Sequence, residues 1–76
     1  MEKIAIHTET IQLDLFLKWA GAVEAGGQVK ILLEEELITV NGRLETARRR
    51  RLSVGDVVEI KDVGCWQVAA EETGGQ

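Results

Sequence analysis

The spacing of hydrophobic residues changes near Leu37, and this change constrains the fold more than any other feature of the 76-residue chain. Before Leu37, apolar residues recur at intervals of three and four, the spacing of an amphipathic helix. After it, apolar and polar residues alternate, the spacing of a strand with one buried face. We therefore expect an α+β fold in one small domain, with two packed helices followed by a small antiparallel sheet.

Two helices are expected before this change. The first has an apolar stripe of four residues, Leu13, Phe16, Leu17 and Ala20. Thr10 is its predicted N-cap, and Gly21 is its predicted end. Gly26 and Gly27 are expected to separate it from a second helix. The stripe of that second helix is formed by Val29, Leu32 and Leu33. Because the linking segment is short, the two helices should pack as a pair.

The sheet is predicted from a hairpin signal. Ile38 and Val40 alternate with a polar residue, and Asn41-Gly42 follows at once. Asn-Gly after an alternating run is the strongest short-range hairpin signal, because both residues tolerate positive φ. Arg43 and Leu44 then begin the return strand.

Further turns and strands complete the sheet. Ser53 to Asp56, with Gly55, has turn chemistry. Strands are predicted over Val57–Lys61 and Cys65–Ala69, and residues 1–8 contain a candidate edge strand. The core is expected over residues 10–70, and the polar stretch 71–76 is expected to fray.

Charge is segregated along the chain. The net charge is −4, yet residues 43–51 contain five arginines and a single acid, Glu45. A local patch attracts a polyanion through its local field, because salt screens charges beyond roughly 8 to 10 Å. The negative net charge of the whole chain therefore does not exclude a nucleic-acid partner.

The residues argue against catalytic and metal chemistry. Cys65 and His7 are the only cysteine and histidine, and structural zinc needs about four such ligands. Neither a nucleophile-base pair nor a phosphate-binding glycine loop is present. We expect no catalytic residue, metal or cofactor, and read Cys65 as a small buried or half-buried apolar residue. No apolar run approaches the ~20 residues that span a membrane, so a cytoplasmic protein without membrane contact is expected.

The stretch Leu13 to Asp62 resembles the S4 RNA-binding domain, and most closely the stand-alone bacterial YaaA/YbcJ-like members. The matching pieces are Leu13-Asp14-Leu15-Phe16-Leu17-Lys18, Gly27-Gln28-Val29-Lys30, Ile38-Thr39-Val40-Asn41-Gly42-Arg43 and Val54-Gly55-Asp56-Val57-Val58-Glu59-Ile60. Each piece alone is weak, whereas their joint order and spacing are specific. Many family members carry Ser-Arg where this chain has Gly26-Gly27. The contact that this Arg would make with the RNA backbone is therefore not expected here.

The resemblance implies a non-enzymatic module for structured RNA, either ribosomal or tRNA-like, with a ribosomal subunit or its precursor as partner. The arginine run itself indicates phosphate recognition, since guanidinium groups bind phosphate in bidentate fashion. The predicted RNA-binding residues are Lys18, Lys30, Arg43, Arg48, Arg49, Arg50 and Arg51. The predicted structural turn residues are Asn41, Gly42, Gly55 and Asp56. In an extended segment alternate arginines point to opposite sides, so two or three of the run should share a surface with Arg43.

Aromatic residues are scarce, and both tryptophans, Trp19 and Trp66, are expected in the core. His7 is expected to have no functional role. Few aromatic side chains are then available to stack on the bases of single-stranded RNA. This favours recognition of folded RNA by its shape and its phosphates.

Two other functions stay open. The first is a protein-interaction adaptor whose basic patch meets an acidic partner. The second is a ubiquitin-like sulfur carrier, suggested by Gly74-Gly75 but disfavoured because Gln76 follows. A ubiquitin-like fold would also open with the hairpin, whereas two helices are predicted before it.

Overall fold

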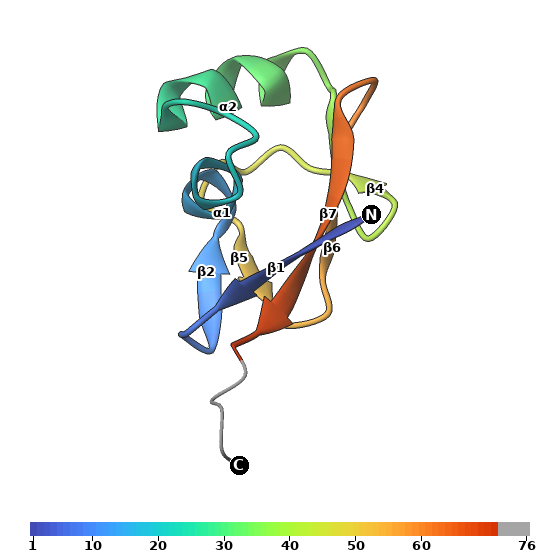
Figure 1. The fold of residues 1–76 in the computed structure, drawn as a ribbon. Helices are drawn as coiled ribbons and strands as arrows, with labels where there is room; N and C mark the ends of the chain where they lie inside the picture. Colours follow the sequence, from blue (N-terminus) through green and yellow to red (C-terminus); the bar gives the residue numbers. More distant parts are fainter. Residues whose placement is uncertain (72–76) are drawn as a thin grey trace.

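The computed structural model describes residues 1–71 as two helices, a five-stranded sheet and a two-stranded sheet (Figure 1). The elements in chain order are β1 (Glu2–Ile6), β2 (Thr10–Gln12), α1 (Leu13–Trp19), α2 (Gly26–Glu34), β3 (Ile38–Val40), β4 (Arg43–Leu44), β5 (Arg51–Ser53), β6 (Val57–Ile60) and β7 (Gly64–Ala70). The expected α+β class is confirmed. Both helices lie to one side of β6 and β7 in the view of Figure 1.

Helix α1 follows strand β2 without a loop, so the prediction that Thr10 caps it is wrong. Thr10 instead pairs with Ser53 in β2, and Gln12 occupies the N-cap position. The first helical N–H groups, of Leu13 and Asp14, donate to backbone carbonyls of the arginine run. The helix has two turns, shorter than its stripe suggested. It ends as predicted at Gly21, whose φ of +78° suits a residue without Cβ.

Helix α2 begins at Gly26, so the two glycines open the helix and do not precede it. Glycine is a poor helix former, and a side chain further along stabilises this start. The Gln28 Oε1 accepts the N–H groups of Glu24 at 2.6 Å and Ala25 at 3.1 Å. Val29 is buried, and α2 packs against α1 as expected for a helix pair.

The five-stranded sheet is mixed, which corrects the expectation of an antiparallel one. Its strand order is β1-β7-β6-β3-β4, and β1 pairs in parallel with β7 in the register Ile4↔Val68. The edge strand expected near the start of the chain is therefore present. Its parallel partner lies some 60 residues away, and no local turn sequence signals such a pairing.

A second sheet, formed by β2 and β5, was not predicted. Its register is Thr10↔Ser53, Ile11↔Leu52 and Gln12↔Arg51. Strands of three residues are too short to show a readable alternation. This sheet makes Arg51 part of a strand and places it opposite Gln12, beside the start of α1.

The hairpin after β3 has the turn that its sequence predicts. Asn41 has a φ of +53° and Gly42 of +83°, the positive values of a primed two-residue turn. The Asn41 side chain donates to Asp56 at 3.0 Å and accepts the N–H of Val57 at 2.9 Å. Asp56 also accepts the N–H of Ser53, closing the Ser53–Asp56 turn in which Gly55 has a φ of +99°. The two predicted turns are thus joined to each other.

The core lies between the helices and the sheet. Its fully buried side chains are Leu13, Phe16, Leu17, Val29, Ile38, Leu52, Val58, Ile60 and Val68. Trp66 is buried as predicted, and Cys65 is half-buried. Trp19 is 60% exposed, so its assignment to the core is wrong. Two positions after Leu17, it lies about 200° around the helix from that stripe residue.

The end of the described chain continues the sheet briefly, since the N–H of Glu71 donates to the carbonyl of Ile6 at 2.9 Å. Residues 72–76, including most of the stretch expected to fray and Gly74-Gly75, lie outside the described residues. In the described part, neither helix is long and apolar enough to cross a membrane.

Candidate nucleic-acid interface

Glu45, the single acid of the arginine-rich segment, fixes the conformation of the loop that follows it. The side chain is buried, with 9% of the residue exposed. Its Oε2 accepts the N–H groups of Thr46 at 3.0 Å and Ala47 at 2.9 Å, and its Oε1 accepts Nη1 of Arg50 at 2.6 Å. Segment 46–50 is therefore a folded loop, not the extended stretch that the sequence suggested.

Hydrogen bonds keep this carboxylate charged despite its burial. Burial raises the pKa of Glu45, but hydrogen bonds from Ala47, Arg50 and Thr46, with the charge of Arg50, outweigh it. The pKa consequently lies below the ordinary value of a glutamate. At neutral pH the loop is organised around an ion pair.

Two of the four consecutive arginines are occupied within the protein. Arg50 is paired with Glu45, and the Nε of Arg48 lies 3.6 Å from Asp14 Oδ2. Their backbones are also used, because the carbonyls of Arg50 and Arg48 accept the first N–H groups of α1 at 2.8 and 3.1 Å. These two residues join the loop to the helix. Their guanidinium groups are less available to a ligand than the sequence implied.

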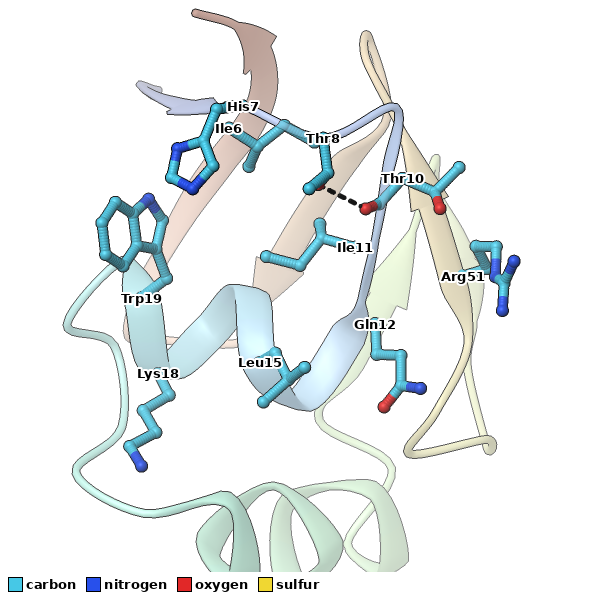
Figure 2. A pocket seen from close by; sticks show the side chains of 10 residues that line it. All are labelled: Ile6, His7, Thr8, Thr10, Ile11, Gln12, Leu15, Lys18, Trp19 and Arg51. Atoms are coloured by element: carbon cyan, nitrogen blue, oxygen red, sulfur yellow. Dashed lines mark hydrogen bonds between the residues drawn. The ribbon is translucent and has the colours of Figure 1, made fainter.

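Arg51 and Lys18 line a shared groove beside β2 and α1 (Figure 2). The groove has a volume of about 680 Å³. It is lined by Ile6, His7, Thr8, Thr10, Ile11, Gln12, Leu15, Lys18, Trp19 and Arg51. Arg51 reaches it from β5, opposite Gln12 of β2, whereas Lys18 reaches it from α1. Within residues 1–71, neither cation has an acid within ion-pair distance.

The remaining predicted cations are exposed elsewhere. Arg43 lies on β4, opposite Val40, at the edge of the five-stranded sheet, and Arg49 lies in the loop. Lys30 lies on α2, four residues after Gly26, and residues four apart share a helix face. A Cβ at Gly26 would lie 3.9 Å from Asp14 Oδ2, so this face of α2 leads toward the Asp14–Arg48 pair.

The structure thus divides the seven predicted cations by environment. Lys18 and Arg51 share the groove, Arg48 and Arg50 are paired with acids, and the other three are exposed on separate elements. Asn41, Gly42, Gly55 and Asp56 lie in the two joined turns already described.

Sequence reasoning missed the aromatic side of the groove. Leu15 and Trp19 are 52% and 60% exposed, and they lie four residues apart on one face of α1. Because this apolar pair lies outside the buried stripe of α1, its spacing could have indicated an exposed apolar face from the sequence alone. His7 packs edge-on against Trp19, with 6.1 Å between ring centroids and an angle of 88°. Among residues 1–71, histidine, cysteine and acidic side chains form no group of three or more that suits a metal ion.

Comparison with known proteins agrees with this architecture. The S4 domain model matches residues 4–69. The probable ribosome maturation protein RlbA of Bacillus subtilis (strain 168) is 46% identical to the chain over 65 residues. That alignment covers 86% of this chain and 92% of the relative. With a family model spanning most of its length and a relative this similar, the chain belongs to the S4 domain family.

Proposed function

We propose that the protein is a non-enzymatic, cytoplasmic RNA-binding module that docks on structured RNA, above all ribosomal RNA or a ribosome precursor. The observation that carries the proposal is a set of cations without acid partners in an otherwise acidic chain. Within residues 1–71, seven cations lack an acid partner, and five of them belong to the predicted RNA-binding residues: Lys18, Lys30, Arg43, Arg49 and Arg51. Phosphate is the ligand that such groups bind by charge-assisted hydrogen bonds.

The family and the relative support the choice of RNA. The chain belongs to the S4 domain family, whose resemblance in the sequence implied RNA binding, and the relative from Bacillus subtilis is named a probable ribosome maturation protein. A single domain of this size with an open groove suits attachment to a large RNA surface better than it suits catalysis.

Salt dependence of RNA binding tests the electrostatic part of the proposal. If about four phosphates are neutralised, affinity for ribosomal RNA should fall about a hundredfold between 50 and 200 mM salt. A flat response would contradict it.

A charge-removal variant tests the surface. Its four changes to glutamine are at Lys18, Arg43, Arg49 and Arg51. Because none of these is in an ion pair of the described residues, the fold should persist while RNA affinity and salt dependence fall. Lys3→Gln with Lys61→Gln, the two cations outside the predicted set, is the control and should bind almost as the wild type does. Crosslinking in cells followed by sequencing would identify the RNA.

A protein-interaction adaptor is the second candidate, since the same exposed cations suit an acidic protein. Salt dependence does not separate the two functions. Purification of the tagged chain with and without RNase does, because partners held through RNA are lost on digestion. Retention of an acidic protein after RNase, with no crosslinked RNA, would favour the adaptor.

A further inference from the structure

The groove between β2, α1 and the β1–β2 connection combines features that the phosphate-binding cations alone do not require. Figure 2 shows the rings of Trp19 and His7 at one end, the guanidinium of Arg51 at the other, and Ile11 and Leu15 between them. A surface that binds only a phosphate backbone does not require the exposed apolar floor that lies between these two ends. Its volume of about 680 Å³ is within the range of small-molecule pockets.

The indole of Trp19 is exposed but held in one orientation. Its Nε1 donates to the carbonyl of Ala5 at 3.1 Å, which anchors the ring to strand β1. His7 supports it from the side, edge to face. A ring fixed before binding loses little entropy when a ligand stacks on it, which is an advantage of a preorganised site. An exposed tryptophan of this kind is suited to contact with a flat partner.

The cations of the groove indicate what that partner carries. Lys18 directly precedes Trp19 on α1, and Arg51 lines the rim of the groove from β5, on the side of β2 away from Ile11. A ligand spanning the groove would therefore place an apolar, planar part over Trp19 and Leu15 and anionic groups beside the two cations. A nucleotide within an RNA strand has both parts, a base with a π-face and flanking phosphates.

We propose that this groove binds one unpaired nucleobase of the RNA, stacked on Trp19, with the neighbouring phosphates on Lys18 and Arg51. Thr8, next to His7, supplies a polar group on the Trp19 side of the groove for the edge of the base. This proposal rests on the proposed RNA-binding function and deepens it. It implies that the RNA target contains a bulge or loop at the docking site, because a base inside a duplex cannot reach the indole.

The test compares three RNA hairpins of one stem sequence at 50 mM salt. The first carries a single adenosine bulge, the second an abasic residue at the bulge, and the third no bulge. The first two have the same phosphates and differ only in the base. Stacking on an aromatic side chain is worth about 1–3 kcal/mol per base. The wild type should bind the adenosine bulge about tenfold more tightly than the abasic bulge, with quenching of Trp19 fluorescence.

Variants assign the difference to the groove. Trp19→Ala should reduce affinity for the adenosine bulge to that for the abasic one and leave abasic binding unchanged, whereas Trp19→Phe should restore part of the preference. Trp66 is buried in the core and supplies the unquenched reference signal. Circular dichroism would show whether each variant is folded.

The outcomes separate this proposal from the one on which it rests. Equal wild-type affinity for the adenosine and abasic bulges, with strong salt dependence, would overturn base binding and leave RNA docking intact. A base preference that survives in Trp19→Ala would also overturn it. Absence of salt-dependent binding to all three hairpins and to ribosomal RNA would overturn both.

Discussion

The loop after Glu45 and the groove beside α1 contain arginines from one unbroken run, but they use them differently. In the loop, Arg48 and Arg50 pair with acids and their carbonyls accept the first N–H groups of α1. In the groove, Arg51 lies in β5 and has no acid partner among residues 1–71. Neighbouring residues of one type thus serve the fold in one place and remain available to a ligand in the other. A basic run in a sequence indicates charge, and only the structure shows which charges are available.

The largest effect should come from removing the acid that organises the loop. Glu45→Ala leaves the guanidinium of Arg50 and two backbone N–H groups without their acceptor. We expect a loss of about 3 kcal/mol in the free energy of unfolding, because hydrogen bonds to a charged, buried group are worth more than neutral ones. Urea denaturation measures it. Glu9→Ala, an exposed acid with the same charge change, should change stability by less than about 0.5 kcal/mol.

The hairpin should matter next, because it delivers Glu45 to its place. The N–H of Glu45 donates to the carbonyl of Ile38 at 2.9 Å, directly after β4. Gly42→Val places a β-branched residue at a φ of +83° and should cost about 2 kcal/mol. Gly27→Ala, at a helical glycine with open space around it, should be neutral or stabilising. Unchanged thermal stability of Gly42→Val would show that the turn relaxes to another type.

Acid should weaken the loop. The pKa of Glu45 is lowered in the folded protein, so its stabilisation is complete above its ordinary value of 4.5 and is lost as pH falls through the lower folded value. The stability difference between the wild type and Glu45→Gln should therefore shrink as pH falls below 4.5. Unfolding curves between neutral pH and strong acid would show it, and a constant difference would mean that the carboxylate contributes no charge-dependent stability.

Substitutions in the groove should affect RNA binding more than substitutions in the loop, the reverse of their effects on stability. Arg51→Gln should lower RNA affinity about tenfold and reduce the salt slope by about one unit, with little change in stability. Arg50→Gln should cost stability and change the slope less. If the two variants had the same slope, the ion pair in the loop would open on binding, and the contrast between the two regions would not apply to the complex.

Much of the fold was predictable because its signals are local. The stripe of α1, the Asn41-Gly42 turn and the buried face of β6 each depend on residues a few positions apart. The parallel pairing of β1 with β7 and the short β2–β5 sheet depend on residues far apart in the chain, and three-residue strands have no readable period. The candidate site followed the same division. The sequence alone identified the arginine run. The acid partners of Arg48 and Arg50 and the exposure of Trp19 could be known only from the structure.

The smallest predicted effect extends the set of available cations from the groove to the helix pair. In the family pattern that the sequence resembles, Ser-Arg stands where this chain has Gly26-Gly27, the first residues of α2. A Cβ at Gly27 meets nothing within 4 Å, so a side chain fits there without displacing its neighbours. Gly27→Arg should raise RNA affinity about threefold and increase the salt slope by roughly one unit, since one more phosphate is neutralised. Gly27→Gln, of similar length without the charge, is the matched control. A gain shared by both variants would reflect a better helix, because glycine costs up to about 1 kcal/mol in a helix, and α2 would then lie outside the RNA-binding surface.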